Sequence, residues 1–348
     1  MQHPDRWIDE FQKNKAMNDV RTAEVSIRRS PVRTRVHRRI FACFLILGMF
    51  GVVVEGVLRF GLGLGNPALI TSDPACSYIV KPDQNIRRFF GHTYINHYGM
   101  RSDEVPAMRN PHTLRLMFVG NSITFGTTRV DQQKIFAELL HHDLPSIVHE
   151  PVEVLNASAG NWTTDNELSY VRSRGIFQSD IVLLVLDQGD LLSPRSVITD
   201  VGSDSAMPFH RGATAIGELW TRFFMPRLSS VLRRGDEGDV ANDNSGAIVN
   251  ANLADLDAFR AIVLKGHAEM VIVYVPSREF VPFASERSAA LLRAWTASRH
   301  VPLVDITAAE LPYSAKEISL PGDIHFNVKG NRMIASAIEQ AWPRVVQP

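Results

Sequence analysis

Hydrophobic residues from position 114 onward alternate between short apolar runs and longer segments of helical periodicity. The apolar runs, which we expect to be strands, lie at 114–119, 152–155, 181–186, 270–275 and 302–306. The helical segments lie at 131–142, 164–175, 253–265, 285–299 and 328–341. Strands that are apolar along their whole length are buried on both faces. The pattern therefore predicts an α/β domain in three α/β/α layers, with a five-stranded parallel sheet in the middle.

A different pattern occupies the first part of the chain. Residues 40–54 are fifteen uncharged, mostly apolar residues, and after Glu55 the apolar run continues to Leu58. As a helix, residues 40–58 extend about 28 Å, close to the ~30 Å hydrocarbon core of a bilayer. A buried core helix is the alternative, although such helices seldom follow a cluster of arginines. A cleaved signal peptide has a shorter basic region. We interpret residues 40–58 as a transmembrane signal anchor.

The charge distribution predicts the orientation of this anchor in the membrane. The whole chain has 37 basic and 37 acidic residues, but residues 1–39 carry ten basic and five acidic ones, a net charge of +5. A basic leader before a single span keeps the N-terminus cytoplasmic. We therefore expect a single-pass protein of the inner membrane, with the rest of the chain periplasmic or otherwise extracytoplasmic. Overall neutrality argues against nucleic acid as a partner. The two cysteines, Cys43 and Cys76, are not expected to form a structural disulfide.

These patterns divide the chain into four parts. Residues 1–39 are a basic cytoplasmic tail, 40–58 the anchor, 59–112 a linker and irregular lead-in, and 113–348 the main domain, with an insertion at about 200–250. The Gly-rich stretch 61–67 is typical of a flexible exit from a membrane. Within the insertion, 233–246 has the composition of a solvated loop. Residues 220–225 are apolar enough for a short helix that closes over something.

Candidate chemistry follows the strands. Gly120-Asn-Ser122 comes after the first strand, where a serine either caps a helix or is held exposed as a nucleophile. Asn156-Ala-Ser-Ala-Gly160 follows the second strand, and it forms either an ordinary turn or a backbone donor for an oxyanion. Near the C-terminus, Asp323 stands two residues before His325 in a Gly-rich loop. That spacing allows the carboxylate to fix the imidazole tautomer, so that the other nitrogen accepts a proton from a serine.

In this order, the segments resemble those of the SGNH/GDSL hydrolase superfamily, over about residues 96–340. Gly120-Asn-Ser122, Asn156-Ala-Ser-Ala-Gly160 and Asp323-Ile-His325 resemble its blocks. Asn96-His-Tyr-Gly-Met-Arg101-Ser-Asp-Glu104 is similar to a lead-in of many bacterial, secreted members, and the whole chain resembles the membrane-anchored bacterial type. The resemblance implies a flavodoxin-like sheet and a triad of Ser122, His325 and Asp323. It also implies an oxyanion hole formed by the backbone N–H groups of Ser122 and Gly160.

The chain departs from the family pattern at two positions. Asn121 replaces the usual aspartate before the serine, and Gly189 stands where the family has an asparagine that binds the oxyanion. One oxyanion donor is worth about 3 kcal/mol, so its loss would slow the reaction strongly unless another group replaced it. Gln188 and Asn161 are the candidates for that replacement.

Two functions therefore compete. One is an esterase, or an acyltransferase, acting on O-acyl groups of a glycan or lipid; the other is an inactive subunit that binds polysaccharide or partners in envelope polysaccharide machinery. No nucleotide-binding motif is present in the sequence, and no cofactor or metal is expected.

Overall fold

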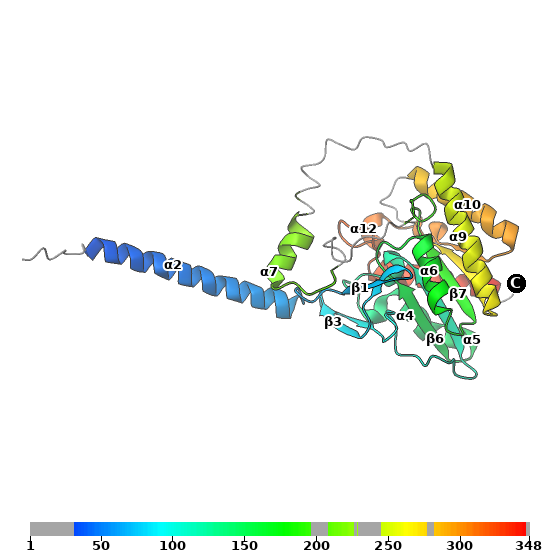
Figure 1. Cartoon of the computed structure of the whole chain (residues 1–348), viewed down its shortest axis with the longest axis horizontal. Coiled ribbons are helices and arrows are strands. Elements are labelled where there is room, and N and C mark those ends of the chain that lie inside the picture. Colours follow the sequence, from blue (N-terminus) through cyan, green and yellow to red (C-terminus); the bar gives the residue numbers. More distant parts are fainter. Residues whose placement is uncertain (1–30, 196–207, 226–227, 229–244, 277–281, 346–348) are drawn as a thin grey trace, which may run out of the picture. The chain divides into compact units, whose positions relative to one another are not determined.

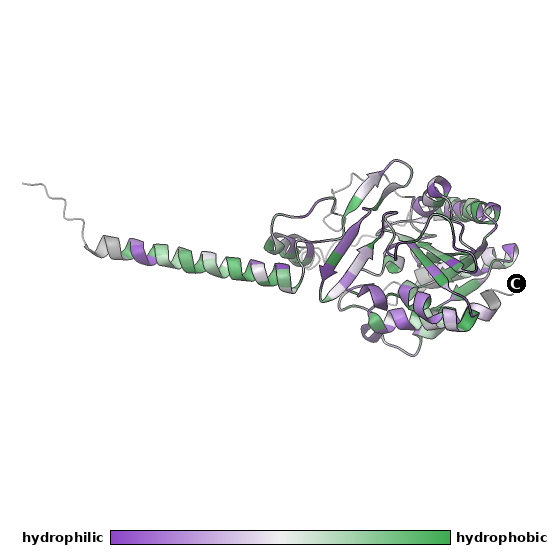
Figure 2. Ribbon diagram, turned by 90° about the horizontal axis from the view of Figure 1, so that it is seen from below, coloured by the Kyte–Doolittle hydropathy of each residue, from purple (hydrophilic) through white to green (hydrophobic). Residues whose placement is uncertain are grey.

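The computed structural model describes residues 31–195, 208–225, 228, 245–276 and 282–345. The chain divides into two compact units, Met1–Val54 and Glu55–Pro348 (Figure 1). The described part of the first unit is helix α2 (Pro31–Gly56), whose last two residues belong to the second unit. The segment Val36–Gly61 is long and apolar enough to cross a membrane, by its length and composition. Figure 2 shows apolar residues around the helix, and Phe44 and Leu47 are exposed, unlike the side chains of a core helix.

The second unit contains a five-stranded sheet in which all strands run parallel, in the order β6-β5-β7-β8-β9. This confirms the predicted fold class. Gly120, at the end of β5, lies opposite Ser158 of β6 and Val185 of β7. The register thus brings the loops that follow these three strands to one edge of the sheet. The strands are β5 (Leu114–Gly120), β6 (Val152–Ser158), β7 (Ile181–Leu186), β8 (Glu269–Tyr274) and β9 (Leu303–Asp305).

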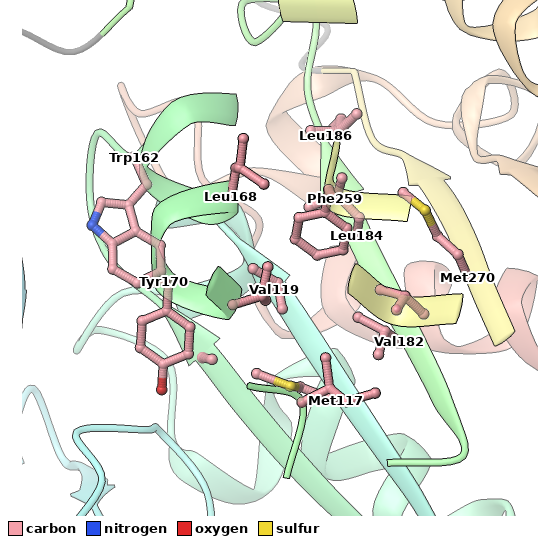
Figure 3. Packing of buried hydrophobic residues seen from close by; sticks show 14 of the residues in the cluster. Met117, Val119, Trp162, Leu168, Tyr170, Val182, Leu184, Leu186, Phe259 and Met270 are labelled. Carbon is pink, nitrogen blue, oxygen red and sulfur yellow. The ribbon is translucent and has the colours of Figure 1, made fainter. Parts of the chain in front are cut away.

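Helices cover both faces of this sheet. Successive residues of each strand point to opposite faces, so each strand contributes apolar side chains to both helix layers. Met117 and Val119 pack in a cluster with residues of α6, α9 and α10, whereas Leu116 and Phe118 pack with residues of α4 and α13 (Figure 3 shows the first cluster). These helices are α4 (Phe136–Asp143), α6 (Thr164–Arg174), α9 (Ser245–Lys265), α10 (Pro282–Arg299) and α13 (Val328–Val345). Shorter turns are η1 (Val57–Gly61), α3 (Ser122–Phe125), η2 (Gln132–Lys134), α5 (Pro145–Val148), α7 (Ala215–Glu218), η3 (Leu219–Phe224), α11 (Thr307–Glu310) and α12 (Ala315–Ile318).

The lead-in before the main sheet is more regular than the sequence predicts. Two antiparallel hairpins replace the expected irregular segment: β1 (Ile70–Asp73) with β2 (Ser77–Val80), and β3 (Gln84–Arg88) with β4 (Gly91–Ile95). Strands of four or five residues are too short to give a clear period, and the residues of β3 are mostly polar.

The stretch 61–67 is not the flexible exit that its glycines suggest. Leu64 is buried, and its N–H donates to the carbonyl of Leu58 at 3.0 Å. Gly63 has a φ of +69°, and a Cβ there would lie 2.1 Å from the carbonyl oxygen of Arg87. Glycine is therefore required for close packing on β3, and the second unit begins without a free linker.

One buried arginine of the lead-in organises the loop after α3. The guanidinium of Arg101 donates to the carbonyls of Phe125 and Thr127, both at 2.7 Å, and to that of Val130 at 2.8 Å. Its Nε donates to the side-chain oxygen of Gln132 at 3.1 Å. Burial lowers the pKa of Arg101 to about 9, so the group is still charged at neutral pH. Buried carbonyls need donors, and a single cation supplies three of them here.

Replacing Arg101 with methionine removes these donors while keeping most of the buried volume. We expect Arg101→Met to lower the free energy of unfolding by about 3–5 kcal/mol, because the carbonyls stay buried without partners. Denaturant unfolding of the solubilised full chain measures this change. Arg87→Met is the control, because Arg87 is exposed on β3, and its effect should stay within about 0.5 kcal/mol. Equal effects of the two substitutions would contradict the role given to Arg101.

Candidate active site

Ser122 lies on a sharp turn between β5 and α3, here called the serine turn (residues 120–122). A Cβ at Gly120 would lie 2.2 Å from Oγ1 of Thr124, so only glycine allows the strand to meet the helix this closely. The Asn121 side-chain oxygen caps α3 by accepting from the Ile123 N–H at 2.9 Å. Capping is thus the role of Asn121, and the hydroxyl of the partly exposed Ser122 does not perform it.

Asp323 and His325 form a directly bonded pair before α13. His325 Nδ1 lies 2.5 Å from Asp323 Oδ1, and Arg129 forms an ion pair with Oδ2 of the same carboxylate. A carboxylate only accepts, so Nδ1 carries the proton and Nε2 keeps its lone pair. Nε2 is buried, and it makes no hydrogen bond to Ser122 or to any other described residue.

The surroundings of His325 keep it neutral. Burial and, to a smaller extent, the positive charge of Arg129 together lower the pKa of His325 to about 4, against an opposing effect of Asp187. Above that pH the imidazole is unprotonated, which is the form that accepts a proton. The mutual electrostatic effect between His325 and Asp187 also places the end of β7 close to the loop before α13.

Hydrogen bonds connect β6 to α3, and the segment after β6 to the lead-in. The buried side-chain amide of Asn156 donates to the carbonyl of Thr124 at 2.9 Å. The Tyr78 hydroxyl, from the lead-in, donates to the carbonyl of Gly160 at 2.7 Å. A Cβ at Gly160 would meet no atom within 4 Å, so this residue borders open space. Asn161 is exposed and has a φ of +58°.

The loop after β7 contains the other candidate for the missing oxyanion donor. Gln188 is buried, and its backbone carbonyl accepts a hydrogen bond from the Ser288 hydroxyl at 2.7 Å. The neighbouring Gly189 provides only a backbone N–H, which donates to the Asp187 carboxylate at 2.6 Å. The assignment of Gln188 or Asn161 to an oxyanion hole therefore remains a prediction.

Three carboxyl groups near the serine turn, of which Glu167 and Asp190 are buried and Asp187 is partly buried, are absent from the sequence-based site. The Asn121 side-chain nitrogen donates to Asp187 at 2.9 Å and to Asp190 at 3.3 Å, and Glu167 of α6 interacts electrostatically with both. Burial raises the pKa of all three carboxyls, and repulsion by neighbouring acids raises it further for Glu167 and Asp190. Hydrogen bonds from Gly189 and Asn121 oppose the rise at Asp187. The replacement of the family's aspartate by Asn121 thus avoids a fourth acid and supplies a donor.

Arg129 is the other residue that sequence reasoning misses. It lies seven positions after Ser122 and 194 before Asp323, so no local spacing links it to the pair. For the carboxyls of Asp187 and Asp190, the sequence signal is an acidic loop after an apolar strand, which either faces the site or caps the next helix. In the part of the chain that the structure describes, no group of three or more His, Cys, Asp or Glu side chains is arranged to hold a metal ion.

No family model and no curated protein matches this chain. Among solved structures, it is similar to a lipolytic protein of the G-D-S-L family from Veillonella parvula (12% identity, 66% of this chain and 99% of that chain, TM-score 0.41). It is also similar to a mutant of Axe2, an acetylxylan esterase from Geobacillus stearothermophilus (13%, 65% and 93%, 0.41). A third is the lipase/acylhydrolase from Enterococcus faecalis (14%, 66% and 96%, 0.43). All three neighbours are described as lipolytic proteins or ester hydrolases, and all three have TM-scores below 0.5.

The substitution Asn121→Asp tests the buried carboxyls. It removes the amide donor and adds an acid beside Asp187 and Asp190, so we expect a loss of about 3 kcal/mol in unfolding free energy at pH 7. The folded state would raise the pKa of the new carboxyl. The loss should therefore be small below about pH 4 and grow as the pH rises. Unfolding measured along a pH series checks this, with Asn121→Ala as the control that removes the donor without adding charge. A pH-independent difference between the two variants would contradict the proposed repulsion.

Proposed function

We propose that this chain is a membrane-anchored, extracytoplasmic serine esterase that removes or transfers O-acyl groups on a glycan or lipid. The observation that carries the proposal is the Asp323–His325 pair, in which Nδ1 is bound at 2.5 Å while the buried Nε2 has no partner. A buried polar atom without a partner is costly in a structural histidine. It is what a general base needs before its proton donor is aligned.

In the proposed reaction, Ser122 is the nucleophile. His325 Nε2 takes the hydroxyl proton as Ser122 Oγ attacks the acyl carbonyl, and it then returns that proton to the leaving alcohol. Asp323 orients His325, and Arg129 holds Asp323 from the other side. A water, or the hydroxyl of an acceptor sugar, then attacks the acyl-enzyme with His325 again as base. The backbone N–H groups of Ser122 and Gly160 bind the oxyanion, assisted by Gln188 or Asn161.

The same proposal includes the location. Residues 40–58 anchor the chain in the inner membrane with the N-terminus cytoplasmic, and the catalytic domain faces the periplasm or another extracytoplasmic space. The support is the apolar segment Val36–Gly61 and the basic residues before it. Acylated carbohydrate or lipid of the envelope is then the substrate that this enzyme meets.

A fluorophosphonate probe tests the nucleophile. We expect the full chain in detergent to be labelled covalently, and Ser122→Ala to lose the labelling. His325→Ala should slow it by about a thousandfold or more, because the base activates the serine. Ser146→Ala, at an exposed serine of α5, is the control and should label like the wild type. Equal labelling of wild type and Ser122→Ala would show that the assignment is wrong.

The pH dependence of ester hydrolysis tests the base. Since the pKa of His325 is about 4, kcat/KM should fall on the acid side with a midpoint near that value. Arg129→Gln should move this midpoint to higher pH, because Arg129 lowers the pKa of His325. Hydrolysis of a chromogenic acetate ester across an acidic to neutral pH series measures both. A midpoint unchanged by the substitution would contradict the electrostatic role of Arg129.

A second candidate function is a catalytically weak or inactive subunit that binds polysaccharide or envelope partners. Gly189 favours it, because this residue has no side chain to replace the oxyanion asparagine. This alternative predicts no turnover of any acetylated substrate together with retained polysaccharide binding. The labelling experiment separates the two functions.

A further inference from the structure

The helix formed by α7 and η3, residues 215–224, is amphipathic, but its charged face packs on the domain and its apolar face is exposed. A helix on the surface of a water-soluble domain has the reverse arrangement. In the helix 215–224 the charged residues face the domain: Glu218 is only 7% exposed and lies 2.7 Å from the guanidinium of Arg88. Arg222, one turn later, bonds to the same carboxylate at 3.1 Å. The Gly65 N–H also donates to Glu218. The polar side of this helix is thus its packed side.

The outward side of the same helix is apolar. Leu219, Trp220 and Phe224 are 39%, 54% and 49% exposed, and the rings of Trp220 and Phe224 stack with centroids 4.6 Å apart. Thr221 is also exposed, but its hydroxyl donates to the helix's own carbonyl of Gly217 at 3.0 Å. Such internal bonding is how a hydroxyl is satisfied where water is absent. A helix with charges inward and large apolar groups outward matches a lipid environment.

This helix is hydrogen-bonded to the last turns of the proposed span. The carboxylate of Glu55 accepts the N–H groups of Ala215 at 2.8 Å and Ile216 at 3.0 Å. Arg59 bonds to Glu55 at 2.8 Å and donates to the carbonyl of Ala213 at 3.0 Å. Glu55 and Arg59 belong to the end of Val36–Gly61, so the helix is bonded to the C-terminal end of that segment.

The surface beside these residues has the composition of a membrane interface. Phe60 is 87% and Phe90 is 90% exposed, and both line a cavity of about 650 Å³ that also includes Arg59 and Arg87. Arg87 is exposed on β3. Aromatic residues and arginines are enriched at the level of the lipid headgroups, where the aromatic ring is buried in lipid and the charged group stays hydrated.

We propose that the helix 215–224 lies in the headgroup region of the outer leaflet, with Ile216, Leu219, Trp220 and Phe224 inserted among the acyl chains. This inference rests on the anchor proposed above. It assigns the bilayer as the partner of the insertion, in place of a cover over Ser122, and it explains an acid at the end of an apolar span: Glu55 binds the interfacial helix to the anchor.

Nitroxide labels at single cysteines in the full chain test this arrangement in lipid nanodiscs that hold one chain each. One variant carries the label at the native Cys43, with Cys76→Ala. The others carry it at Phe224→Cys, Ile216→Cys or Ile147→Cys, with both native cysteines removed. Ile147 is the control, because it is exposed on α5, at the opposite end of the second unit from α7 in Figure 1. The measured quantity is the ratio of label accessibility to oxygen, which enters lipid, over that to a water-soluble nickel complex.

We expect a severalfold higher ratio at positions 43, 216 and 224 than at 147, with the highest at 43. A high ratio at 43 with water-like ratios at 216 and 224 would overturn this inference while leaving the anchor intact. A water-like ratio at 43 would overturn both. Loss of accessibility to both reagents at 216 and 224 would mean that protein covers the helix, and would also overturn the inference. Circular dichroism and agreement between the two helix positions guard against a misfolded variant.

Discussion

In the segment between α3 and α4, the guanidinium of Arg101 supplies the donors for three backbone carbonyls. Because the donors form one rigid planar group, the carbonyls of Phe125, Thr127 and Val130 are fixed relative to one another. The same loop carries Arg129, which binds Asp323, and Asp323 in turn binds His325. A single buried cation in the lead-in thus supports the orientation of a histidine more than two hundred residues later.

In the proposed reaction, negative charge develops on the acyl oxygen near several carboxyl groups, so the charge state of these groups matters. Negative charge on a reacting acyl oxygen is disfavoured by nearby carboxylates, and Asp187, Asp190 and Glu167 are all close to the serine turn. Burial raises the pKa of each, and repulsion adds to the rise at Glu167 and Asp190, which favours the uncharged forms. Asn121 bonds to two of them without adding charge. The departure from the family pattern at this position is therefore consistent with its surroundings.

The elements that could be predicted from the sequence are those whose pattern is local. The five main strands are apolar on both faces, and the fold follows from their alternation with helices. The hairpins at 70–95 were missed because their strands are short and partly polar. Helix α9 begins at Ser245, eight residues before its predicted start, since its first residues lack an apolar period. The Asp323–His325 contact is local in sequence, whereas Arg129 and the buried carboxyls come together only through the sheet register.

The close packing of Gly63 and Leu64 on the second unit limits the length of free chain between the proposed span and the proposed active site. A flexible tether would let the domain explore a volume of solution, with a reach that grows with linker length. Here the chain packs on the second unit within a few residues of the proposed span, which leaves little free chain to extend that reach. Encounter with a membrane-attached acyl donor then becomes a search in two dimensions, in which lateral diffusion and local surface density set the rate. Soluble polysaccharide must instead come to the membrane to be processed.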